Sequence, residues 1–184
     1  MRWDELFDDL EAQLVEAELA DLQAEVSDRE RREVALLHLV DRLRPVIGEP
    51  VTVRVLGAGV IGGRLSAFGP DWLLLAEVGG REALVAATAV LAVGGLAAQT
   101  SAPHSEGAVA ARLNLAFALR AVVRDRAAVT VTLTDGTAEG GTLDRVGADF
   151  LELAAHPPDE ARRRDAVRSI RTYPLTAVAL VRRA

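Results

Sequence analysis

The chain of 184 residues contains no cysteine and no lysine, and aromatic residues make up only 4% of it. Without cysteine, disulfides, thiolate catalysis and cysteine-ligated zinc are excluded. All 21 basic residues are arginine, which together with abundant alanine, valine, leucine and glycine indicates coding bias in a GC-rich bacterium. The scarcity of aromatic side chains argues against a platform on which nucleic-acid bases stack.

Long apolar runs are also missing. No stretch of about 20 apolar residues could cross a membrane as a helix, and the N-terminus lacks a basic leader followed by an apolar segment. We therefore expect a cytoplasmic protein. Hydrophobic residues nevertheless make up 50% of the chain, which suffices for a buried core.

The net charge of −6 is distributed unevenly along the chain. Residues 1–49 carry 14 acidic and 6 basic side chains, whereas residues 144–184 carry 6 acidic and 8 basic ones. The N-terminal part is therefore strongly acidic, which opposes contact with nucleic acid and favours a basic partner. The C-terminal part is mildly basic.

The N-terminal 44 residues contain no glycine or proline, and their first part has apolar residues at helical spacing. These residues are Trp3, Leu6, Phe7, Leu10, Leu14, Ala17 and Leu22. They predict an amphipathic acidic helix over residues 1–27. Ser27 and Glu30 have the spacing of a capping box, which favours a new helix over residues 28–43. One long helix with Ser27 on its surface is the alternative.

The apolar stripe of this acidic helix is the predicted contact with a partner helix. Its members are Trp3, Phe7, Leu10 and Leu14. Such a stripe can pair with another chain as a coiled coil or helical hairpin. Packing of the helix against the rest of its own chain is the alternative interpretation.

The sequence after Pro50 has the character of β-structure. Residues 51–55 alternate and are β-branched, which predicts a strand. From there to residue 93, short apolar segments separated by glycines predict a meander of tightly turned strands. A loop rich in Ala, Ser and Gly at residues 94–107 then precedes a predicted helix at residues 108–126, after which the strand pattern restarts.

Part of the chain is an internal repeat. Residues 51–76 match residues 129–154 at an offset of 78, with 11 identities in 26 positions. Residues 88–90 match residues 176–178 at an offset of 88, so the second copy has ten extra residues in the loop between. We interpret this pattern as the duplication of a unit made of one helix and about five strands.

The predicted fold class is α+β, with an N-terminal helical arm and two tandem five-stranded small β-barrels, each preceded by a helix. We assign residues 1–27 to the acidic arm, 28–96 to the first helix and barrel, 97–107 to a linker and 108–184 to the second helix and barrel. Units of about 75 residues are marginally stable alone. We therefore expect them to pack together or to associate.

The repeated strand motif G-x-L-x-x-V/F-G-x-D-W/F-L-x-L resembles the first motif of the Sm-like family, whose members form small SH3-like barrels. Its carriers are Gly63, Leu65, Phe68, Trp72 and Leu74 in the first copy, and Gly141, Leu143, Val146 and Phe150 in the second. The second family motif is matched loosely by residues 88–93 and 174–181. A barrel of the ribosome-maturation-factor type is the nearest alternative.

The resemblance implies self-assembly, because Sm-like proteins form rings by pairing the edge strands of neighbouring barrels. The two barrels of one chain could also pair with each other. The resemblance does not extend to the RNA pocket of the family. Gly69 and Leu73 stand where its RNA-binding motif has Asp and Asn, and Gly147 and Leu151 replace them in the second copy.

Clustered arginines in and directly after the inserted loop are the candidate contacts for nucleic-acid phosphates. They are Arg162, Arg163, Arg164, Arg168 and Arg171. A solvated charged loop is the alternative, since no aromatic platform lies beside them in the sequence.

No catalytic residue, metal site or cofactor site is predicted. His38, His104 and His156 lie far apart and lack the spacing of metal ligands. Residues 57–62 match G-x-G-x-x-G, but a dinucleotide site needs a helix directly after the glycines, and a strand-like segment follows here.

The sequence therefore predicts a non-enzymatic interaction or assembly module that needs no cofactor and does not bind membranes. Its expected partner is a second copy or another cytoplasmic protein. The alternative is a divergent RNA-binding protein that uses the arginine-rich loop of the second barrel.

Overall fold

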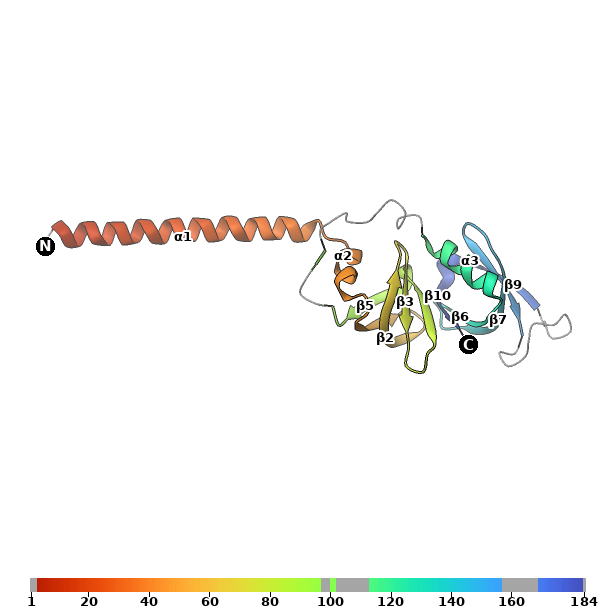
Figure 1. Ribbon diagram of the computed structural model, residues 1–184. Helices are drawn as coiled ribbons and strands as arrows, with labels where there is room; N and C mark the ends of the chain where they lie inside the picture. The colour runs from red at the N-terminus through yellow and green to blue at the C-terminus, as the bar shows by residue number, and fades with distance from the viewer. Residues whose placement is uncertain (1–2, 97–99, 102–112, 157–168, 184) are drawn as a thin grey trace. The chain divides into compact units, whose positions relative to one another are not determined.

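The structure is a computed structural model that describes residues 3–96, 100–101, 113–156 and 169–183. The chain forms two compact units, Met1–His38 and Leu39–Ala184. The first unit is helical and the second contains all the strands (Figure 1). No helix in the described part of the chain is long and apolar enough to span a membrane.

The N-terminal unit is one helix, α1, which runs without interruption from Trp3 to Ala35. The predicted break at Ser27 is therefore wrong. The helix continues through the capping-box residues because no Gly or Pro interrupts the segment, and because charged side chains pair along the continuous helix. Arg29 contacts Glu33 at 3.3 Å, and Arg31 pairs with Asp28.

The helical region ends in short pieces instead of a second long helix. After α1, the amide of Leu36 donates to the carbonyl of Glu33, and that of Leu37 to Val34, both at 3.1 Å. A short helix α2 (Leu39–Leu43) and the 3₁₀ turn η1 (Arg44–Val46) follow. Pro45 in η1 cannot continue a helical hydrogen-bond ladder, which fits the end of the helical region.

In the described residues, ten strands make up a single antiparallel sheet. They are β1 (Pro50–Val55), β2 (Gly59–Phe68), β3 (Trp72–Ala76), β4 (Glu82–Ala86), β5 (Val90–Gly94), β6 (Ala128–Leu133), β7 (Ala138–Val146), β8 (Phe150–Ala155), β9 (Ser169–Pro174) and β10 (Val178–Arg183). Their order across the sheet is β5-β1-β2-β3-β4-β10-β6-β7-β8-β9. The strand predicted at residues 51–55 is confirmed as β1.

The prediction of two separate five-stranded barrels is wrong, because β4 pairs with β10 and joins both halves of the chain into one open sheet. In this seam Leu84 lies opposite Val181, and Val85 opposite Leu180. Both strands are apolar on successive residues and are buried from 83 to 86 and from 178 to 181. Burial on both faces is typical of an interior strand. Such a strand lacks the alternation of apolar and polar residues that is expected when one face of a sheet contacts water.

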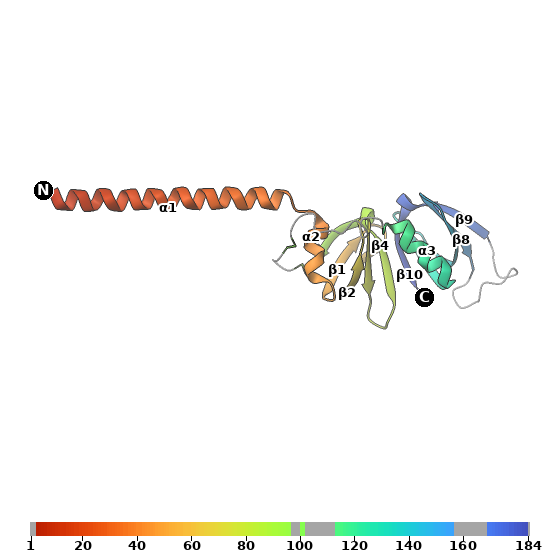
Figure 2. The same ribbon diagram turned by 45° about the horizontal axis from the view of Figure 1, so that its top comes forward.

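The helices also differ from the predicted one per barrel, since α1 and α2 both precede β1. The helix predicted at residues 108–126 is observed as α3 (Leu115–Asp125), and residues 102–112 lie outside the described part of the chain. Asn114 caps α3 by accepting a hydrogen bond from the amide of Phe117 at 2.9 Å. Figures 1 and 2 show α3 against the half of the sheet that contains β6 and β10.

Corresponding strands of the two halves pair in corresponding registers. Val51 lies opposite Gly63 in β1 and β2, and Val129 lies opposite Gly141 in β6 and β7. The amide of Gly69 donates to the carbonyl of Trp72 at 2.9 Å, as Gly147 does to Phe150. The hydrogen-bond geometry thus follows the sequence match at an offset of 78.

Candidate interaction surfaces

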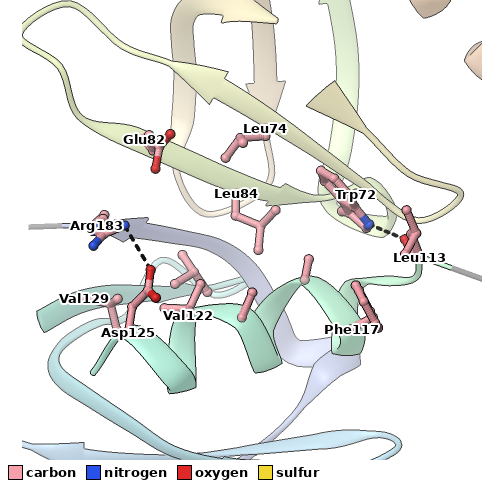
Figure 3. Close-up of a pocket in the computed structure, with 13 residues that line it drawn as sticks. Trp72, Leu74, Glu82, Leu84, Leu113, Phe117, Val122, Asp125, Val129 and Arg183 are labelled. Atoms are coloured by element: carbon pink, nitrogen blue, oxygen red, sulfur yellow. Dashed lines mark hydrogen bonds and ion pairs between the residues drawn. The ribbon is translucent and has the colours of Figure 1, made fainter. Parts of the chain in front are cut away.

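An apolar groove of about 360 Å³ opens between α3 and the sheet (Figure 3). Trp72 and Leu74 line it from β3, Leu84 from β4, and Phe117 and Val122 from α3. The groove also extends to Val129 and Val181. Its walls therefore come from both halves of the sheet and from the helix that precedes the second half.

Hydrogen bonds fix one end of the groove. The indole Nε1 of Trp72 donates to the carbonyl of Leu113 at 2.6 Å, and the amide of Leu115 donates to the Asp71 carboxylate at 2.7 Å. A Cβ on Gly69 would lie 2.3 Å from the indole nitrogen, so only glycine leaves room for this ring. The start of α3 is thereby tied to the β2–β3 hairpin.

The charged residues of the groove lie at its other end. Asp125 of α3 and Arg183 of β10 form an ion pair at 3.4 Å, and Glu82 lies on the neighbouring strand (Figure 3). Both members of the pair are about half exposed, so it contributes little stability. The groove can bind an apolar group, and its described lining supplies no pair of ionisable groups arranged for proton transfer.

The two ends of the sheet form a second kind of surface. In the described structure β5 and β9 each have one hydrogen-bonded neighbour, β1 and β8 respectively. Their side chains are more exposed than those of the seam: Leu91 of β5 is 58% exposed and Ile170 of β9 is 61% exposed. A strand with one free edge presents unpaired backbone donors and acceptors to another chain.

The arginines predicted to contact nucleic acid lie partly outside the described residues. Arg162, Arg163, Arg164 and Arg168 fall in residues 157–168, which the structure does not describe. Arg171 lies in β9 and pairs with Glu139 of β7, which offsets its charge. RNA binding therefore stays a prediction.

The residues predicted to contact a partner helix all belong to α1. Trp3, Phe7 and Leu10 lie in the stretch for which the structure describes the backbone alone. Leu14 is 63% exposed. Their contact with a partner also stays a prediction.

The structure describes two of the three histidines. His38 follows α1, His104 lies outside the described residues, and His156 is buried beside the hydroxyl of Thr142, with 2.8 Å between Nε2 and Oγ1. No cluster of metal-binding side chains occurs among the described residues. Residues 57–62 form the β1–β2 turn and the start of β2, so no helix follows these glycines.

Tyr173 of β9 allows a spectroscopic test of the contact between β9 and Glu139 of β7. Burial, together with a hydrogen bond from its hydroxyl to Glu139, raises the pKa of Tyr173 above its usual value. Because the folded pKa lies above the unfolded one, the associated stability is present below about pH 10 and is lost as the pH rises through the folded pKa.

We expect absorbance titration of this tyrosine, the only one in the chain, to give a pKa above that of the unfolded protein. Glu139→Gln should lower the pKa of Tyr173 partway toward its usual value, because burial is the larger cause and remains. Glu82→Gln on β4 serves as the control and should leave the titration unchanged. Equal titration of the parent and Glu139→Gln would contradict the contact.

Protein-family models, curated proteins and solved structures were compared with the chain, and none of them matches it. The Sm-like resemblance therefore rests on the motif residues of the chain alone.

Sequence reasoning missed the groove. A partial signal was present in α3, where Phe117 stands on the opposite side of the helix from Leu115, Leu119 and Val122, which follow one another at i, i+4 and i+7. An apolar residue on the far side of a helix that already covers a core indicates a second apolar contact. The hydrogen bond from Trp72 to Leu113 joins residues far apart in the sequence, so no local pattern predicts it.

Proposed function

We propose that the protein is a non-enzymatic assembly module in which copies of the chain join head to tail, β5 of one copy pairing with β9 of the next. The observation that carries this proposal is the β4–β10 seam, where the chain joins its own two halves by the same kind of pairing. A heterologous contact of this type can be repeated by each added copy.

The proposal rests on an equivalence between the end strands and the seam strands, which we attribute to duplication. In the second half, β9 pairs with β8, and Phe150 lies opposite Pro174. In the first half, β4 pairs with β3 in the same way, and Trp72 lies opposite Ala86. β9 is thus the counterpart of β4.

The other seam strand has its counterpart in β5. In the second half, β10 pairs with β6, and Val178 lies opposite Leu133. In the first half, β5 pairs with β1, and Val90 lies opposite Val55. Both pairs shift register directly after these residues. The free ends of the sheet, β5 and β9, are therefore the counterparts of two strands that already pair with each other.

This equivalence fixes the register of the proposed contact. In the seam, Val181 lies opposite Leu84. Their counterparts, by the offset of 88, are Val93 of β5 and Thr172 of β9. Copies should therefore pair with Val93 of one opposite Thr172 of the next.

A cysteine cross-link tests this register, because the natural chain contains no cysteine. We expect the double variant Val93→Cys/Thr172→Cys to form disulfide-linked oligomers on mild oxidation, since Cα atoms of directly opposed residues lie about 4.5–5.5 Å apart, within the range that a disulfide spans. The products would be measured on non-reducing gels and by light scattering.

Two matched variants complete the test. Val93→Cys/Ile170→Cys shifts one cysteine by two positions along β9 and should cross-link much less. Leu84→Cys/Val181→Cys places the pair in the seam and should give a disulfide within one chain. A parent protein that is monomeric at all concentrations, or cross-linking that is no greater in the matched register, would refute the proposal.

A further inference from the structure

The middle of α1 carries a row of apolar side chains that face solvent. Leu19, Leu22 and Val26 follow one another at the spacing of i, i+3 and i+7, so they lie along one face of the helix. They are 54%, 58% and 55% exposed. We call this row the leucine face of α1.

The spacing of the leucine face is that of the a and d positions of a coiled coil. Leu19 and Val26 take position a, and Leu22 takes position d. Helices in proteins gain most of their stability from packing of an apolar face and not from intrinsic propensity. An exposed face of this kind on a helix of 33 residues therefore points to a partner helix.

The residues that flank the leucine face determine which partner fits. Glu18 and Glu25 stand at position g, directly before Leu19 and Val26, and Glu16 stands at position e of the preceding heptad. All three side chains are exposed. Positions e and g contact the partner helix and select it by charge.

Among the described side chains, no ion pair involves Glu16, Glu18 or Glu25. The sequence contains no basic residue from Trp3 to Asp28. Two of the three arginines at the end of α1, Arg29 and Arg31, pair with Glu33 and Asp28. The leucine face is therefore bordered by negative charge.

A second copy of α1 is a poor partner for this face. In a parallel pair Glu25 would lie opposite Glu30 of the other copy, and in an antiparallel pair the glutamates at g would face each other. Like charges in these positions cost association energy. We infer that the leucine face of α1 docks a basic amphipathic helix of another protein, with arginine or lysine at its own e and g positions.

Two synthetic peptides test this inference on the full chain. Both have isoleucine at a and leucine at d, but one carries lysine at e and g and the other glutamate. We expect the lysine peptide to bind, more weakly as salt is added, and the glutamate peptide not to bind. Fluorescence anisotropy of labelled peptide measures the affinity.

Variants of the face must change this binding selectively. Leu22→Gln should raise the Kd for the lysine peptide about tenfold or more, as expected for a buried apolar anchor, whereas Val34→Gln, which lies off the leucine face but is also exposed, should leave it unchanged. Glu16→Lys/Glu18→Lys/Glu25→Lys should reverse the preference between the peptides. Circular dichroism verifies that each variant keeps its helix content.

Three results would overturn the inference: equal affinity for both peptides, insensitivity of binding to Leu22→Gln, or self-association of the parent that is lost with Leu22→Gln. The inference is independent of the proposed pairing of sheet edges. A parent that forms no cross-links through Val93 and Thr172 would refute the assembly proposal and leave peptide binding intact.

Discussion

Replacing Leu180 by alanine is expected to lower the free energy of unfolding by about 3 kcal/mol, within the usual range for a buried Leu→Ala change. Leu180 is 1% exposed and lies in β10, the strand that pairs with β4 on one side and β6 on the other. A cavity at this position removes contacts from the core where the two halves of the sheet meet. The loss should therefore destabilise both halves together.

Two intrinsic reporters allow this to be measured. Trp72 lies in the first half of the sheet and Tyr173 in the second, and Trp3→Phe removes the only other tryptophan. In denaturant titrations of Leu180→Ala in that background, the Trp72 and Tyr173 signals should shift to the same lower midpoint.

Leu91→Ala is the matched control for Leu180→Ala. Leu91 lies in the end strand β5 and is 58% exposed, so its truncation should cost less than about 0.5 kcal/mol. If Leu180→Ala moved the Tyr173 transition but not that of Trp72, the halves would unfold independently, and the continuous sheet would not act as one cooperative structure.

The sequence identified β1 and the strand-rich character of the segment that follows it, because these signals are local. Alternating β-branched residues predicted β1, and glycines marked the turns of the meander. In the structure, Val51 lies opposite Gly63 and Val129 opposite Gly141. These features depend on residues close together in the chain.

The joining of the strands was predicted incorrectly because it depends on distant pairing. β4 and β10 are nearly a hundred residues apart in the sequence, and either strand could close a barrel within its own half. The uninterrupted apolar segments 83–86 and 178–181 were a usable signal that both strands are buried on two faces. The helix break predicted at Ser27 was wrong for a different, local reason. A four-residue capping motif does not interrupt a long run of helix-forming residues.

The candidate contact residues stay predictions, because the structure holds no partner molecule for them. Leu14 of α1 is 63% exposed. Arg171 was proposed to contact phosphate from its place in a basic cluster, yet its ion pair with Glu139 depends on the pairing of β7 and β9 with β8. The groove beside Trp72 likewise needs the position of α3, which no local pattern supplies.

Gly141→Ala should be among the most destabilising single-methyl additions in the chain, at about 3 kcal/mol. A Cβ at Gly141 of β7 would lie 2.2 Å from the carbonyl oxygen of Ala154 in the neighbouring strand β8. That oxygen belongs to the backbone of an interior strand and cannot move aside without disturbing the pairing of β8.

Two glycines of β2 calibrate this result. At Gly63, the counterpart of Gly141, an added Cβ would lie 2.8 Å from the carbonyl oxygen of Ala76, so Gly63→Ala should cost less than Gly141→Ala. At the adjacent Gly62 no atom lies within 4 Å, and alanine there should stabilise the fold by up to about 1 kcal/mol by restricting the unfolded chain. Thermal and denaturant unfolding should rank the variants with Gly141→Ala lowest and Gly62→Ala highest. The reverse order would show that close approach of the strands at their bend does not determine where glycine is required.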